Sequence, residues 1–139
     1  MSEENVELVQ DVIEASKRGE MDRVFAAYDR DIEWRISELQ TLTPITDFEP
    51  VYRGHEGIRR FWRTWAEAWE TPTFEYEEFI DAGDTVVSVL SQRMRGRTSG
   101  IEQEWNAYAQ NWTIKDGKIV GVEFFVDRAQ ALEAAGLSE

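Results

Sequence analysis

The stretch AYAQNW, residues 107–112, places three side chains that could bind or polarise a small molecule at alternate positions. In an extended strand Tyr108, Gln110 and Trp112 point to one face, because side-chain direction alternates with a period of two. This face is aromatic with one amide at its centre, and a buried amide without a partner costs about 1–3 kcal/mol. The amide must therefore bond to other side chains, to water or to a guest. The pattern fits either a filled core or the wall of a pocket.

The composition excludes several kinds of chemistry and partner. The 139 residues include no cysteine and one histidine, His55, which argues against thiolate and multi-histidine metal sites within one chain. The formal net charge is −13, from 15 basic and 28 acidic residues, and it disfavours nucleic acid and anionic membranes as partners. No apolar run is long enough to span a membrane, and the N-terminus is acidic and amphipathic. We expect a cytoplasmic protein with no metal and no cofactor.

Hydrophobic periodicity predicts an α+β fold, and we expect residues 1–139 to form a single domain. Helical spacing of apolar residues predicts helices at about residues 2–18, 21–29, 54–70 and 127–137. Period-two alternation predicts a strand at 31–36 and four longer strands after residue 72, joined in pairs by the turns DAGD and KDGK. Residues 37–50 carry two prolines and no regular period. They are predicted to form a long loop, a candidate lid.

Four segments of the chain resemble the SnoaL-like polyketide cyclase family, within the nuclear-transport-factor-2-like superfamily. They are YRGHEGIRRFW (52–62), RMRGRTSG (93–100), NWTIKDGKI (111–119) and DRAQALEAAGL (127–137). The resemblance implies a ketosteroid isomerase-like fold, in which a cone-shaped, curved antiparallel sheet wraps around the N-terminal helices and holds an apolar pocket. It also implies a homodimer formed through the convex face of the sheet. Members include isomerases, epoxide hydrolases, polyketide cyclases, dehydratases and non-enzymatic binding modules, so the fold does not determine the chemistry.

The acid–base groups that the resemblance would imply have few counterparts in this chain. Trp34 stands where an isomerase-type site would have its base, and an indole cannot remove a proton. Gln110 stands where that site would have a protonated aspartate, so it can donate a hydrogen bond to a carbonyl but cannot act as an acid. An epoxide-hydrolase relay would need aspartates where Arg95 and Phe124 stand, near Arg93. Phe124 also replaces the aspartate of a SnoaL-type last strand.

Other polar residues remain open candidates. His55 either serves the local turn that opens its helix or acts as a base near pH 7. Arg93 faces either a ligand or an acidic partner. A shift of one residue in the strand register changes the face to which its side chain points, so the register decides between the two. Glu104 lies two positions from Asn106, on the extension of the Tyr108 face, and is the best remaining candidate for an inward carboxylate. The favoured alternative for Glu104 is a surface position near the end of the strand. Asp127 is predicted to cap the last helix.

We therefore predict a deep, largely apolar pocket that binds a small hydrophobic, carbonyl-bearing molecule. Its predicted ligand-binding residues are Trp34, Trp62, Trp65, Arg93, Tyr108, Gln110, Trp112 and Phe124. If the pocket is catalytic, Gln110 and Tyr108 donate hydrogen bonds to the carbonyl oxygen while His55 or a carboxylate moves the proton. The step would be a metal-free isomerase, cyclase or dehydratase reaction. The alternative is a non-catalytic ligand carrier or a dimeric assembly module, which the sparse acid–base inventory favours.

Overall fold

The structure is a computed structural model that describes residues 2–36, 49–70 and 72–137. Its helices are α1 (Ser2–Lys17), α2 (Met21–Ala27), α3 (Gly54–Ala68) and α4 (Arg128–Ala134). Its strands are β1 (Tyr28–Arg35), β2 (Val51–Arg53), β3 (Thr73–Ala82), β4 (Thr85–Arg95), β5 (Glu102–Lys115) and β6 (Lys118–Phe125). Most of the predicted lid, residues 37–48, lies outside the described residues.

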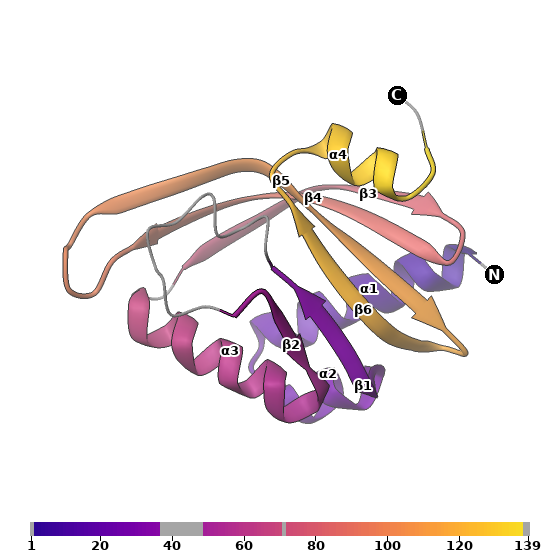
Figure 1. The fold of residues 1–139 in the computed structure, drawn as a ribbon, viewed down its shortest axis with the longest axis horizontal. Helices are drawn as coiled ribbons and strands as arrows, with labels where there is room; N and C mark the ends of the chain where they lie inside the picture. The colour runs from indigo at the N-terminus through magenta and orange to yellow at the C-terminus, as the bar shows by residue number, and fades with distance from the viewer. Residues whose placement is uncertain (1, 37–48, 71, 138–139) are drawn as a thin grey trace.

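The strands form one curved sheet in the order β2-β1-β6-β5-β4-β3 (Figure 1). Helices α1, α2 and α3 lie against one face of this sheet, and α4 lies on the opposite face. The predicted α+β class and the cone-like sheet around the N-terminal helices are therefore confirmed. One detail differs from the expected antiparallel sheet, because β1 pairs with β6 in parallel while the other neighbours are antiparallel. The sheet is mixed.

The local sequence explains where the elements begin and end. Asp116 and Gly117 have φ angles of 51° and 75°, as the predicted tight turn between β5 and β6 requires. Asp127 caps α4 as predicted, since its side chain accepts a hydrogen bond of 2.8 Å from the backbone N–H of Gln130. Helix α2 ends at Ala27, two residues before its predicted end, because Tyr28 is already extended and its ring is buried in the core.

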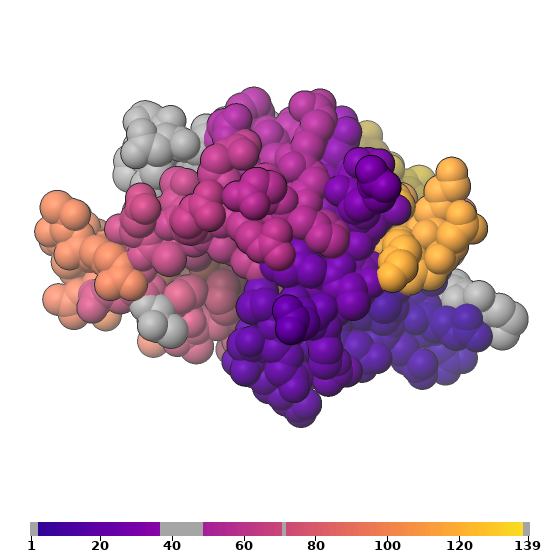
Figure 2. Space-filling view, turned by 90° about the horizontal axis from the view of Figure 1, so that it is seen from below, coloured from indigo at the N-terminus to yellow at the C-terminus, as the bar shows by residue number. Residues whose placement is uncertain are grey.

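Apolar side chains are buried on both faces of the sheet. The larger core fills the concave face, where α3 contributes Ile58 and Phe61. The space-filling view in Figure 2 shows the helices covering this face, with the β4–β5 hairpin projecting beyond them. A smaller core lies under α4 on the convex face, formed by Val87, Ala109, Phe125, Ala131 and Leu132. Helix α4 thus occupies part of the face predicted to form the dimer. No helix among the described residues is long and apolar enough to cross a membrane.

Candidate functional site

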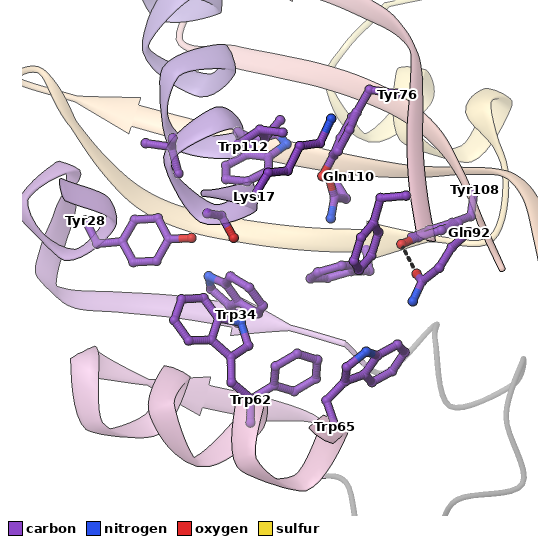
Figure 3. A pocket seen from close by; sticks show the side chains of 16 residues that line it. Lys17, Tyr28, Trp34, Trp62, Trp65, Tyr76, Gln92, Tyr108, Gln110 and Trp112 are labelled. Atoms are coloured by element: carbon purple, nitrogen blue, oxygen red, sulfur yellow. Dashed lines mark hydrogen bonds between the residues drawn. The ribbon is translucent and has the colours of Figure 1, made fainter. Parts of the chain in front are cut away.

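A cavity of about 140 Å³ lies between the concave face of the sheet and helices α1 and α3. Most of the predicted ligand-binding residues line it: Trp34, Trp62, Trp65, Tyr108, Gln110, Trp112 and Phe124. Figure 3 shows the labelled tryptophan rings converging from the sheet and from α3 on a common space. The aromatic face seen in the sequence at 107–112 is thus a cavity wall.

The Gln110 amide at the centre of that wall is held by two neighbouring side chains. Its Oε1 accepts hydrogen bonds from the Ser88 hydroxyl at 3.0 Å and from the Tyr76 hydroxyl at 3.2 Å. The Ser88 oxygen in turn accepts from the indole N–H of Trp112 at 2.9 Å. The amide nitrogen of Gln110 makes no hydrogen bond with any described residue, and the amide points into the cavity (Figure 3). Its N–H groups remain available to a guest.

Tyr108, the other predicted hydrogen-bond donor, is already engaged within the protein. Its hydroxyl donates to Oε1 of Gln92 at 2.6 Å, the dashed contact in Figure 3. The Gln92 amide nitrogen lies 3.5 Å from the sulfur of Met94, which is a weak acceptor. The Gln110 oxygen thus accepts two hydroxyl protons and has no further capacity, whereas the Gln92 oxygen accepts one. Tyr108 orients Gln92 rather than presenting its own proton to the cavity.

Two further donors of the cavity lining lack partners. The indole N–H of Trp34 is buried and has no hydrogen-bond acceptor among the described residues. The Tyr28 hydroxyl forms no hydrogen bond with the described part of the chain, and Tyr28 is only 4% exposed. Lys17 is the only charged side chain among the described lining residues, and its Nζ lies 3.8 Å from Glu14. These residues supply no carboxylate and no histidine to the cavity.

Burial sets the protonation state of the tyrosines around the cavity. Burial raises the pKa of Tyr28 and of Tyr108 well above the ordinary value of 10.0, and the nearby Tyr76 raises both further. Burial also raises the pKa of Tyr76, although the hydrogen bond to Gln110 opposes the shift. At neutral pH all three hydroxyls are protonated. They can donate hydrogen bonds but cannot remove a proton from a guest.

The same tyrosines predict a loss of stability in alkali. Above about pH 10 the unfolded chain releases its phenolic protons while the folded protein keeps those of Tyr28 and Tyr108. The stabilisation is complete below that pH, and the free energy of unfolding then falls by about 1.4 kcal/mol per pH unit for each tyrosine. Urea unfolding between pH 8 and pH 11 measures this slope.

Phenylalanine variants provide the control for that titration. Tyr28→Phe should leave stability at pH 7 nearly unchanged, because the lost hydroxyl has no hydrogen-bond partner among the described residues. Tyr108→Phe should lower stability at pH 7 by about 1 kcal/mol, because Gln92 loses its donor. Both variants should flatten the alkaline slope by the contribution of one group. A slope that neither variant changes would show that other groups cause the alkaline loss.

His55 lies behind the cavity wall rather than in it. Its Nε2 is 3.1 Å from the carbonyl oxygen of Tyr28, and a carbonyl only accepts, so the ring nitrogen carries the proton and donates. The imidazole packs on Phe25 with ring centroids 5.0 Å apart, and Phe25 packs on Trp62 at 5.4 Å. His55 does not line the cavity, and its contacts match the structural role in the turn between β2 and α3.

Arg93 and Glu104 lie outside the cavity, so Arg93 has the acidic partner and not the predicted ligand contact, and Glu104 has the surface position and not the inward one. The two side chains form an ion pair with each other and are 68% and 48% exposed. Arg93 points outward because Leu90, Gln92 and Met94 are the buried side chains of that part of β4. For Glu104 the cause is an irregularity in β5, where Ala107 has a φ of 56° and the pairing with β4 shifts register. The alternation therefore breaks between Asn106 and Tyr108. Trp105 is buried instead, and Glu104 and Asn106 are exposed.

Several residues of the site were not among the predicted ones. Lys17, Tyr28 and Tyr76 line the cavity, and Ser88 connects two of its wall residues. Lys17 and Tyr28 lie within the predicted helices 2–18 and 21–29, which gave no sign that they reach the cavity. A signal for Ser88 was present, since a small polar residue interrupts the apolar run VVSVL that becomes buried in β4.

The curved sheet, the helices on its concave face and the cavity between them define an NTF2-like α+β fold. An NTF2-like protein from Burkholderia thailandensis is 30% identical, with 91% of this chain and 95% of that chain covered and a TM-score of 0.72. Another from Burkholderia pseudomallei is 22% identical, with 93% and 95% covered and a TM-score of 0.71. TerC, co-crystallised with polyporic acid, is 20% identical, with 95% and 98% covered and a TM-score of 0.74.

Within this fold, residues 9–122 match the model of the SnoaL-like domain, and the chain belongs to that family. The resemblance predicted from the sequence is therefore confirmed. No curated protein matches the chain.

Proposed function

We propose that the cavity binds a small, uncharged, ring-shaped molecule that carries a carbonyl group. The observation behind this proposal is the Gln110 amide, whose oxygen is saturated by Ser88 and Tyr76 while its nitrogen is left without a partner among the described residues. An N–H group facing an apolar cavity is best satisfied by an acceptor that arrives with a guest. The unpartnered donors of Trp34 and Tyr28 reinforce the same preference for an acceptor.

The size of the cavity limits the part of the guest that it encloses. An engineered apolar cavity of about 150 Å³ in another protein holds one benzene molecule. The cavity here, about 140 Å³, therefore suits one ring with a short substituent. The surrounding indole and phenyl groups provide apolar contact, and the donors fix the orientation of the carbonyl. That TerC was co-crystallised with polyporic acid supports the idea that this fold accommodates small organic molecules.

The lining favours binding and orientation over proton transfer. The described lining residues include no carboxylate and no imidazole, and the tyrosines stay protonated at neutral pH. We therefore favour a carrier or ligand-binding protein. The second candidate is a metal-free isomerase or cyclase, because donors around a carbonyl also stabilise an enolate and the Lys17 amine lines the same cavity.

Titration with acetophenone and with ethylbenzene tests the proposed guest, followed by calorimetry or by quenching of the tryptophan fluorescence. The two molecules have nearly the same shape, but only acetophenone carries the carbonyl. Acetophenone should bind about three- to tenfold more tightly, the effect of one additional net hydrogen bond. Failure of both molecules to bind, or equal affinities, would contradict the proposal. Exchange of the acetophenone methyl protons in heavy water, above the rate without protein, would favour the enzyme candidate.

A further inference from the structure

A groove of about 470 Å³ lies beside the cavity, between helix α1 and strand β3, and its lining includes Gln10, Glu14, Glu75 and Phe79. Ile13, Lys17, Phe74 and Tyr76 line both the groove and the inner cavity. The two spaces thus share a wall of four residues, and the outer one has room for a longer group than the inner one.

Aromatic rings of β3 form the floor of the groove. Tyr76 and Phe79 stack with ring centroids 5.6 Å apart and an interplanar angle of 12°. Phe74 is 39% exposed, although large hydrophobic side chains are mostly buried in the described part of this protein. Exposed apolar surface that adjoins a cavity is a common feature of binding grooves. The floor therefore offers apolar contact to a group that lies in the groove.

The charges around the groove favour an uncharged occupant. Glu14 and Glu75 line the groove beside Lys17. Lys17 lies 3.8 Å from the Glu14 carboxylate, and its Nζ is 5.8 Å from the centre of the Tyr76 ring. Its charge is thus already offset from two sides, and an anion would gain little from it while meeting two carboxylates. A cation would meet Lys17 over the same aromatic floor.

We infer that the ligand has two parts: a ring that fills the inner cavity and an uncharged apolar chain that leaves between α1 and β3 and lies along Phe74, Tyr76 and Phe79. This inference rests on the proposed function. It is argued from the four lining residues that the two spaces share, from the sizes of the spaces and from the apolar floor. The chemical class is an alkyl- or aryl-substituted cyclic or aromatic ketone.

A series of acetophenones with para-ethyl, para-butyl and para-hexyl chains tests this inference on the 139-residue protein. Each methylene that enters the groove should tighten binding about two- to fourfold. Phe79→Ala should reduce this gain per methylene, whereas its affinity for unsubstituted acetophenone should not change, because Phe79 lines only the groove. Ile101→Ala, at a residue 63% exposed and outside the groove, should leave the whole series unchanged and provides the matched control.

A second variant keeps the test decisive if Phe79→Ala does not fold. Gln10 is exposed on α1 and lines the groove, so Gln10→Trp should fill the groove and cancel the gain from longer chains. If acetophenone binds but longer chains add nothing, the inference is overturned while the proposed function stands. If longer alkyl substituents tighten binding equally in the parent protein and in both variants, the substituent lies outside the groove and the inference is also overturned. If acetophenone itself does not bind, the proposed function fails instead.

Discussion

Replacing Trp34 by alanine is expected to lower the free energy of unfolding by about 3–5 kcal/mol, the usual range for removing a buried tryptophan. Trp34 is 7% exposed and lies at the centre of the aromatic cluster between β1 and α3. Its ring centroid is 5.2 Å from Phe61, 5.6 Å from Phe124 and 6.1 Å from Trp62. These rings already border a cavity, so the void left by alanine would merge with it rather than collapse. Urea unfolding at pH 7 measures the loss.

Two variants separate the packing of Trp34 from other effects of the substitution. Trp34→Phe keeps one ring in place and removes the unpartnered indole N–H, so it should lose less than half of what alanine loses. Trp62→Ala removes a similar ring from α3, but Trp62 is partly exposed. Its free energy of unfolding should therefore fall by less than that of Trp34→Ala. A loss below about 1.5 kcal/mol for Trp34→Ala would contradict the central position of this side chain.

The elements with strong local signals were predictable from the sequence. The apolar spacing in residues 54–70 predicted α3, and Ile58 and Phe61 are buried as that spacing requires. The turn KDGK needs a left-handed backbone, which asparagine, aspartate and glycine adopt at low energy, and the hairpin forms there. In each case a few adjacent residues determine the local conformation.

Features that depend on pairing between distant segments were not predictable in the same way. The parallel pairing of β1 with β6 joins Trp34 to Val122, and no local signal encodes such a contact. The irregularity at Ala107 requires a positive φ at a residue that does not favour it, so the sequence suggested plain alternation instead. A single break of this kind reverses every side chain beyond it. It places Glu104 at the surface, away from the face that carries Tyr108.

The residues of the site also fall into those with a local sequence signal and those that depend on distant contacts. Aromatic side chains at alternate positions of a strand, or at helical spacing, mark the buried face of that element. The aromatic lining at Trp34, Trp62 and Trp112 was therefore predicted. Lys17 and Tyr76 were missed because each belongs to an ordinary helix or strand pattern and reaches the cavity only through the packing of α1 on β3. The polar contacts of Gln110 likewise depend on which side chains β3 and β4 place beside it.

Gln110→Met should have the largest effect on ligand binding among single substitutions. Methionine has nearly the same size, so the cavity keeps its shape while the amide donor disappears. The carbonyl of bound acetophenone would then lose its hydrogen bond inside an apolar space, which costs about 1–3 kcal/mol, or about five- to 150-fold in affinity. Binding of ethylbenzene, which needs no donor, should stay within about a factor of three. Calorimetric titration of both molecules measures the difference.

The same substitution should also lower stability, since the Ser88 and Tyr76 hydroxyls lose their shared acceptor. Ser88 is fully buried and cannot turn to water, so we expect a loss of about 1–3 kcal/mol in urea unfolding. Gln130→Met makes the same exchange on the exposed face of α4 and should change neither stability nor binding by more than about 0.5 kcal/mol.

The four affinities, of two guests for the parent protein and for Gln110→Met, form a thermodynamic cycle. Any change in cavity shape or in overall stability acts on both guests and cancels in the cycle. What remains is the coupling between the Gln110 amide and the carbonyl oxygen. A coupling of at least about 1 kcal/mol is expected if the unpartnered N–H groups of Gln110 hold the guest. A coupling near zero would mean that the guest carbonyl is bound elsewhere, with Tyr28 and Trp34 as the remaining donors.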